Sequence, residues 1–249
     1  FKSRLLPIQV ALIQVSPPDD FGWMSLGISV DVTAAAAEAA DLVIAQVNRN
    51  MPRVQGRSNI HVNDIDIFVE HDEELRAIGQ YPDVAAARNI ARYVSRLVDD
   101  GSTMQMSLGA TSDANIAALM EKNDLGIHTQ YVTNTIMKLM AMGVVTNRKK
   151  GFNEGKIICS NAIGTKDLYD LLDNNSAVEF HPSKYVNDPR IISQNHKMVA
   201  MNIGKEIDLT GQVAADALAY NNFSGVTGIV DFFRGASMSE GGKSILMLT

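Results

Sequence analysis

Short apolar segments rich in β-branched residues alternate along the chain with segments whose apolar residues recur every three or four positions. The first pattern predicts strands at 8–15, 41–48, 64–70, 103–108, 155–160, 197–202 and 243–248. The second predicts helices at 33–40, 83–100, 112–123, 131–142, 165–175 and 187–195. This alternation predicts an α/β fold with open, mostly parallel sheets and flanking helices.

Residues typical of helix ends support several of these helices. Ser112 and Thr165 stand where N-caps are expected, and Pro189 stands where a first-turn proline follows Asn187 and Asp188. Gly143 directly follows the helix predicted at 131–142, as a C-terminal glycine does.

The segment 71–83 is acidic, then contains a glycine and a proline, and the regular pattern resumes after it. Such a segment is typical of a domain boundary. We therefore predict that 1–75 is the C-terminal part of a first domain and that 76–249 is a second domain, truncated at its end.

Composition narrows the classes of partner. The 249 residues carry a net charge of −6 without a basic stripe, which argues against nucleic acid. No apolar run is long enough to span a bilayer, and no signal peptide opens the chain. The lone Cys159 excludes an internal disulfide and favours a reducing, cytoplasmic location. The chain starts without Met and stops within a predicted strand, so we expect it to be a fragment.

Three stretches combine turn residues with polar groups. Gly109 lies between a predicted strand and a predicted helix, and Gly225 and Gly228 lie in a glycine-rich loop. Backbone amides in such turns can face an anion or a carbonyl oxygen, although ordinary turns look the same in sequence. Asn50 follows a predicted strand, where α/β proteins often place ligands. Asp231 and Arg234 are near enough in sequence to form an ion pair.

Other side chains suggest no further chemistry. The five histidines follow no metal-binding spacing, so we expect no metal. Cys159 is most simply a buried small side chain. The basic cluster 147–150 predicts a solvated turn after a helix end, where a contact with a ligand phosphate stays an open alternative.

Eight stretches in the same order resemble the acetyl-CoA hydrolase/transferase family of CoA-transferases, which includes 4-hydroxybutyrate CoA-transferase. They are 10–31, 47–53, 60–70, 126–130, 143–150, 185–189, 208–216 and 223–236. The resemblance implies two similar open α/β domains and a substrate that is coenzyme A or its acyl thioester, with a small carboxylate as acceptor. Relatives are longer at both ends. We expect a homodimer and no membrane partner.

The resemblance also implies a mechanism and a set of residues. In the family a glutamate attacks the thioester to give an anhydride and CoA thiolate, and the thiolate then forms a glutamyl-CoA thioester. Backbone amides hold the oxyanion of each intermediate. By this resemblance Gly225, Val226, Thr227 and Gly228 bind CoA, while Gly109 and Ala110 form the facing turn. Asn50 and Met51 come from the first domain.

Gln130 stands where the family has its catalytic glutamate, within His128-Thr129-Gln130. A carboxamide is a poor nucleophile, and the loss of covalent catalysis costs roughly 5–6 kcal/mol of barrier. Three explanations stay open: a natural subgroup that orients a water for hydrolysis, an inactive acyl-CoA-binding or regulatory module, or an engineered change. The neighbouring residues also depart from the family pattern, which favours the first two. Thr227 replaces a common glycine, which narrows the CoA channel.

Overall fold

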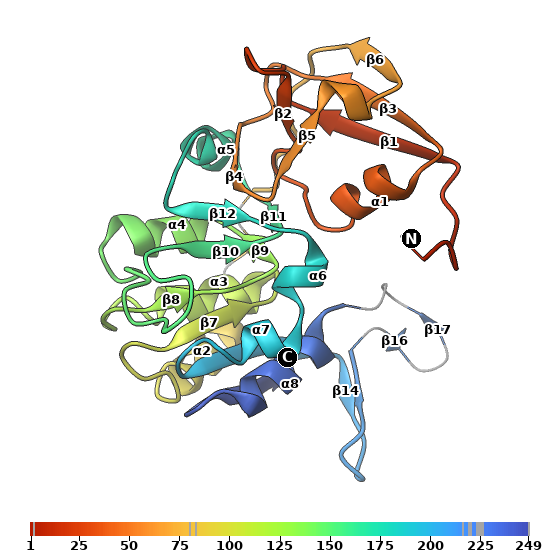
Figure 1. Ribbon diagram of the computed structural model, residues 1–249. Coiled ribbons are helices and arrows are strands. Elements are labelled where there is room, and N and C mark those ends of the chain that lie inside the picture. The colour runs from red at the N-terminus through yellow and green to blue at the C-terminus, as the bar shows by residue number, and fades with distance from the viewer. Residues whose placement is uncertain are drawn as a thin grey trace. The chain divides into compact units, whose positions relative to one another are not determined.

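The computed structural model describes residues 1, 3–79, 81–82, 84–215, 217–218, 221–222 and 227–248 (Figure 1). Contacts between Cα atoms divide the chain into two compact units. Unit 1 comprises 1–79, 131–134 and 156–186, and unit 2 comprises 80–130, 135–155 and 187–249. Two later segments thus join the N-terminal residues in unit 1. The domain division at 75 and 76 stays a prediction, because contact units and evolutionary domains need not coincide.

Unit 1 contains a parallel sheet in the order β1-β3-β6, formed by Val10–Val15, Leu42–Val47 and Ile67–Glu70. Helix α1, Thr33–Ala39, connects β1 to β3 as a parallel pairing requires. Residues of β1 alternate between the two faces, so Ala11, Ile13 and Val15 are buried while Leu12 is exposed. Strands β2, Trp23–Ser25, and β5, Asn59–His61, pair in antiparallel fashion, and a single 3-10 turn follows at Val62–Asp64.

Two smaller parallel pairings complete unit 1. Strands β10, β12 and β4 form one sheet, and β9 and β11 form another. Their bounds are Ile157–Cys159, Val178–Phe180, Gln55–Gly56, Tyr131–Val132 and Asn161–Ala162, with helices α5 at Lys166–Leu172 and α6 at Ser183–Val186. Gly56 is required here, because a Cβ would lie 2.4 Å from the carbonyl oxygen of Phe180.

Unit 2 is built on a parallel sheet in the order β18-β13-β7-β8. Its strands are Lys243–Leu248, Met198–Gly204, Thr103–Met106 and Gly126–Ile127. The helices are α2 at Ala85–Val94, α3 at Ala110–Ala117, α4 at Asn134–Ala141, α7 at Pro189–Ile192 and α8 at Ile229–Met238. Buried Met104, Met198 and Met201 contribute to the core of this sheet.

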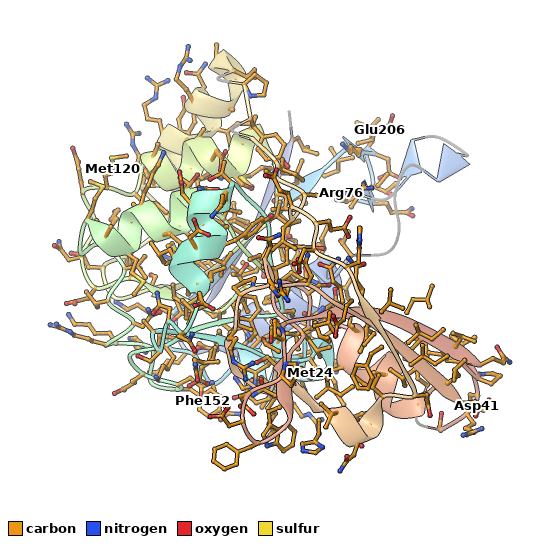
Figure 2. All side chains as sticks on the ribbon, turned by 90° about the horizontal axis from the view of Figure 1, so that it is seen from above. Met24, Asp41, Arg76, Met120, Phe152 and Glu206 are labelled. Atoms are coloured by element: carbon orange, nitrogen blue, oxygen red, sulfur yellow. The ribbon has the colours of Figure 1, made fainter. Side chains whose placement is uncertain are left out.

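Two short antiparallel pairs follow β13 in unit 2. They are β14 with β15, Glu206–Ile207 and Val213–Ala214, and β16 with β17, Ala217–Leu218 and Asn221–Asn222. Glu206 lies on the first pair, whereas Met24 lies among the packed side chains of unit 1 (Figure 2). No helix in the described ranges is long and apolar enough to cross a membrane.

The α/β class with mostly parallel sheets and flanking helices is confirmed, and each predicted strand overlaps an observed one. The helices are shorter than predicted. Residues 131–132 form β9 rather than the start of a helix, and α2 ends at Val94 rather than at residue 100. The segment predicted as a helix at 187–195 is helical only at Pro189–Ile192.

The predicted helix ends had mixed outcomes. Asp188 caps α7 by accepting a hydrogen bond from the Arg190 amide, with Pro189 in the first turn as predicted. Gly143 has the positive φ of 76° expected after α4. Ser112 as an N-cap is wrong, because Gly109 turns the chain earlier and α3 begins at Ala110. Thr165 takes the N-cap position of α5 as predicted, but its side chain makes no cap bond. Its hydroxyl instead accepts a hydrogen bond from the Asn134 side-chain Nδ2.

Candidate functional site in unit 2

Gln130 lies just beyond the carboxyl end of β8. Its neighbour Thr129 is buried, and the Thr129 hydroxyl donates to the Met106 carbonyl at 3.3 Å, which joins the ends of β8 and β7. Gly109 and Ala110 follow β7, so the predicted turn and Gln130 leave adjacent parallel strands at the same edge of the sheet. This edge is where parallel α/β sheets place ligands.

At position 109, the backbone conformation favours glycine. Its φ is +125°, while a Cβ would meet only Ile203 Cδ1 at 3.7 Å, an ordinary contact. The Gly109 carbonyl accepts from the Asp113 amide at 3.1 Å, which continues α3 backward into the turn. The glycine therefore permits a turn that other residues adopt only with strain.

At position 228, glycine is favoured because two side chains approach its Cα closely. It is the N-cap of α8 with φ −75°, so no unusual backbone angle requires glycine there. A Cβ on Gly228 would lie 2.7 Å from Gln130 Nε2 and 2.8 Å from Asn187 Nδ2. The structure thus brings Gln130 and Gly228 together, as the resemblance implied, and a Cβ at position 228 would require both carboxamides to shift.

Asn187 is a further residue of the candidate site, and no sequence motif indicated it. Its Oδ1 is buried and has no hydrogen-bond partner among the described residues. A buried polar atom without a partner is costly, and a bound ligand relieves that cost. The only signal in the sequence was its place in the 185–189 stretch, which was interpreted as a helix start.

The start of α8 offers further polar groups. Gly228 has no side chain with which to cap the helix, and amides in the first turn of a helix lack partners within the helix.

Partial burial, and then the charge of Asp188, raise the pKa of the Asp231 carboxyl. Asp188 is the charged neighbour that contributes to this shift, so the pairing of Asp231 with Arg234 that the sequence allows has no support from the pKa of Asp231.

His128 has a supporting role in this region. It is fully buried, its ring lies edge-on to that of Phe232 with centroids 6.1 Å apart, and its Nδ1 is 3.4 Å from Asn195 Nδ2. It therefore packs the strand end against α8 rather than facing a ligand. Within the described ranges, no cluster of His, Cys, Asp and Glu side chains could hold a metal ion.

The structure describes only some of the other residues predicted for the site. Thr227 is exposed beside Gly228, and Gly225 and Val226 lie outside the described residues. Asn50 and Met51 belong to unit 1, where they line a cavity of about 420 Å³ together with Arg49, Tyr169 and other side chains. The fully buried Asn48 orders this loop, because its Oδ1 accepts from the Asn50 amide at 3.0 Å.

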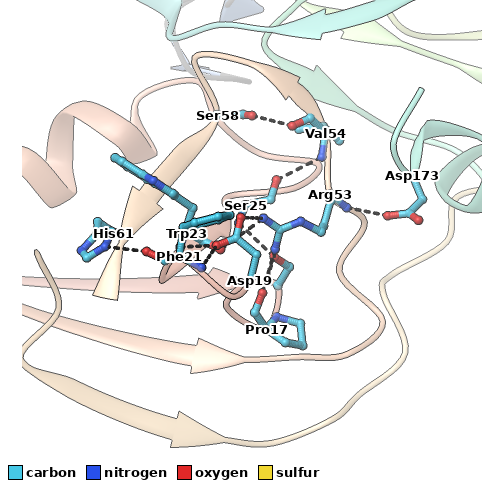
Figure 3. A network of polar contacts seen from close by, with 11 residues as sticks. Pro17, Asp19, Phe21, Trp23, Ser25, Arg53, Val54, Ser58, His61 and Asp173 are labelled. Carbon is cyan, nitrogen blue, oxygen red and sulfur yellow. Dashed lines mark hydrogen bonds and ion pairs between the residues drawn. The ribbon is translucent and has the colours of Figure 1, made fainter. Parts of the chain in front are cut away.

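Arg53 anchors the same loop of unit 1 (Figure 3). Its guanidinium donates to the Ser16 hydroxyl, the Pro17 and Trp23 carbonyls and the Asp19 carboxylate at 2.9 to 3.2 Å. Its backbone amide donates to Asp173 at 2.8 Å. The Trp23 amide, followed by Phe21 and Arg53, holds the pKa of Asp19 below its usual value.

Comparison with known proteins names the family. The models of the acetyl-CoA hydrolase/transferase N-terminal and C-terminal domains match residues 2–79 and 164–249. The 4-hydroxybutyrate coenzyme A transferase of Clostridium kluyveri is 45% identical over this entire chain. The succinyl-CoA:cyclohexane-1-carboxylate CoA transferase of Geobacter metallireducens is 37% identical over 96% of it. The chain spans little more than half of these relatives, 58% and 55% of their lengths.

Solved structures agree with this assignment. RipA from Yersinia pestis superposes with a TM-score of 0.91 at 36% identity, over 96% of this chain and 55% of that one. The 4-hydroxybutyrate CoA-transferase from Porphyromonas gingivalis superposes with a TM-score of 0.89 at 37% identity, over 98% and 59%. The chain belongs to the acetyl-CoA hydrolase/transferase family.

Proposed function

We propose that the protein acts on short acyl-CoA thioesters, as an acyl-CoA:carboxylate CoA-transferase or an acyl-CoA hydrolase, with Gln130 at the nucleophile position. One observation carries the proposal: the Gln130 carboxamide lies against Gly228 at the start of α8. Relatives named as CoA transferases support the same substrate class.

Two amide donors converge on one point of the site. Gln130 Nε2 and Asn187 Nδ2 both lie within 3.0 Å of the place that a Cβ would take on Gly228. Donors that converge in this way, together with the first-turn amides of α8, suit the oxygen of a thioester carbonyl as it gains negative charge. In our proposal Gln130 therefore binds and polarises the thioester.

The same carboxamide limits the chemistry. A neutral amide does not form the acyl anhydride on which family transfer depends, so the covalent route is closed at Gln130. In hydrolysis, water adds to the thioester carbon and the C–S bond breaks. One proton of the water goes to the CoA sulfur and the other to solvent, so the products are a carboxylate and the CoA thiol. The Gln130 Oε1 can accept a hydrogen bond from that water. A catalytically inactive acyl-CoA-binding or regulatory module is the second candidate, and the same missing carboxylate favours it.

Other contacts belong to the proposal as well. Gly109, Ala110, Gly225, Val226, Thr227 and Gly228 contribute to CoA binding, and Asn50 and Met51 contribute from the first domain. The partners are acyl-CoA and a small carboxylate, and the assembly is a homodimer. No metal takes part in the proposed chemistry.

Calorimetric titration with acetyl-CoA and with free CoA tests the proposal, alongside mass spectrometry of the same mixtures. We expect saturable binding of acetyl-CoA with a Kd between about 1 μM and 1 mM, the usual range of substrate affinities. Release of free CoA above the protein-free rate identifies a hydrolase, and binding without release identifies a binding module. Absence of binding to both ligands contradicts the proposal.

A further inference from the structure

Strand β8 is the edge of the unit 2 sheet, and it leads directly to Gln130. On its inner side the Gly126 amide donates to the Ser102 carbonyl at 2.9 Å, and the His128 amide donates to the Met104 carbonyl at 3.0 Å. In a parallel pair, alternate residues bond to the same neighbour, so the backbone of Ile127 faces away from β7. An edge strand leaves such groups without a partner strand.

Two side chains take the place of that missing strand. Asn147 Oδ1 accepts from the Ile127 amide at 2.9 Å, and Lys150 Nζ donates to the Ile127 carbonyl at 2.8 Å. Both come from the loop after α4, which bonds to Leu125 through the amides of Thr146 and Asn147. The backbone groups on the outer edge of β8 are thus hydrogen-bonded to residues of this loop.

Lys150 is placed in an unusual way for a lysine. It is fully buried, although the basic cluster 147–150 predicted a solvated turn. Its stem lies across Gly126, where a Cβ would come within 2.4 Å of Lys150 Cγ. Burying an ammonium group is expensive, and a well-placed hydrogen bond offsets part of that cost. Asn147 is 2% exposed and holds a φ of +57°, which asparagine tolerates better than most residues.

We propose that Asn147 and Lys150 are positioning residues that fix Gln130 at Gly228 by holding both backbone groups of Ile127. From Ile127 the chain continues through His128, packed against Phe232, and Thr129, bonded to Met106, to Gln130. Ile127, His128 and Thr129 are fully buried, so a shift at Ile127 passes to the half-buried Gln130. The catalytic consequence rests on the proposed function, whereas the positioning itself does not.

Nuclear magnetic resonance of protein labelled with ¹⁵N-glutamine tests the positioning without any turnover. Loss of one side-chain amide signal in Gln130→Glu assigns the Gln130 carboxamide. We expect Lys150→Met to move that signal and Lys149→Met to leave it in place. Lys149 is the matched control, because it is the preceding residue, its side chain is 59% exposed, and it pairs with Asp124 at 3.2 Å.

Asn147 gives an independent pair of variants. Asn147→Gly allows the positive φ but lacks the acceptor for the Ile127 amide, so we expect the Gln130 signal to move. Asn147→Asp keeps an acceptor oxygen and tolerates the same φ, so we expect the signal to stay. This pair decides the question even where Lys150→Met fails to fold.

A kinetic arm uses the Gln130→Glu background. There we expect Lys150→Met to lower kcat about 10- to 100-fold while KM for acyl-CoA changes by less than about threefold, because misplacement affects the transition state more than binding. If the Gln130 signal moves but the unmodified protein neither binds nor cleaves acetyl-CoA and Gln130→Glu shows no turnover, the proposed function is wrong and the positioning stands. If Lys150→Met and Asn147→Gly lower Tm but leave the Gln130 signal unmoved, both residues are merely structural and the inference is overturned.

Discussion

A single contact, that of the Gln130 carboxamide with Gly228, connects the sequence of this chain to its chemistry. A turn is the usual reason for a glycine. At Gly228 the reason is instead the close approach of the Gln130 and Asn187 side chains. Glutamine keeps the length of the family glutamate and loses its charge. On the proposed function, the site therefore keeps the shape of a CoA site while lacking the group that attacks.

Gly228→Ala tests this contact. Its Cβ would lie 2.7 Å from Gln130 Nε2 and 2.8 Å from Asn187 Nδ2, below any normal contact, so both carboxamides must move. We expect the affinity for acetyl-CoA to fall at least about tenfold, equivalent to about 1.4 kcal/mol, in a calorimetric titration. Gly79→Ala is the control, because nothing lies within 4 Å of its Cβ position. Equal affinities of the two variants contradict this account of Gly228.

The elements that present the candidate residues are held by side chains as much as by strand pairing. In unit 1 the loop after β3 carries Asn50 and Met51, and Arg53 fixes it through contacts with residues 16–23 and Asp173. Arginine suits this role because its planar group serves several acceptors at once.

Arg53→Lys removes that geometry while keeping the charge. Lysine reaches fewer of the acceptors, so we expect the free energy of unfolding to fall by about 1–3 kcal/mol in urea denaturation. Arg49→Lys serves as the control within the same loop. The Arg49 side chain is 78% exposed, and its ion pair with Asp72 is long at 3.6 Å, so this pair contributes little to stability. A loss for Arg49→Lys that matches the loss for Arg53→Lys argues against a specific role of the Arg53 network.

The sequence predicted these elements better than it predicted their contacts. Strands such as β1 and β13 follow from local apolar runs, and Pro189 and Gly143 mark real ends. Short strands such as β2 and β9 were missed because tertiary pairing, not local pattern, creates them. Burial of Lys150 was missed for a similar reason, because Gly126 and Ile127 that receive it lie on another element.

For the candidate site, the resemblance pointed to Gln130 and Gly228, which lie together in the structure, and it did not point to Asn187. Its role depends on a buried oxygen without a partner, which no local pattern reveals. The turn at Gly109 was identified, yet the start of α3 was placed two residues late, because a φ of +125° cannot be inferred from composition.

At the scale of the whole molecule, many exposed carboxylates are stabilised as anions. The pKa of Asp19, Asp99, Asp100, Asp124, Asp188 and Asp208 is lowered by hydrogen bonds or by nearby cations. For Asp124 the Thr146 hydroxyl contributes most, followed by Lys149. Asp231 differs from these aspartates, because burial and then the charge of Asp188 raise its pKa.

These shifts predict the pH dependence of stability. A group with a lowered pKa stabilises the fold above its unfolded pKa of about 3.9, and this stabilisation is lost as pH falls through the folded value. We expect Tm to stay nearly constant from about pH 7 to pH 5 and to fall steadily below about pH 4. Thermal unfolding followed by circular dichroism measures this, and a Tm that rises on acidification contradicts it.

The central claim is that the site is built for acyl-CoA but lacks its nucleophile, and Gln130→Glu tests it most directly. The unmodified protein and the variant are incubated with acetyl-CoA and a panel of small carboxylates, and new acyl-CoA and free CoA are followed by mass spectrometry. We predict that Gln130→Glu forms new acyl-CoA at least about 10⁴-fold faster than the unmodified protein, the factor that covalent catalysis supplies. Transfer by the unmodified protein at the rate of the variant, or no transfer by either, contradicts the account.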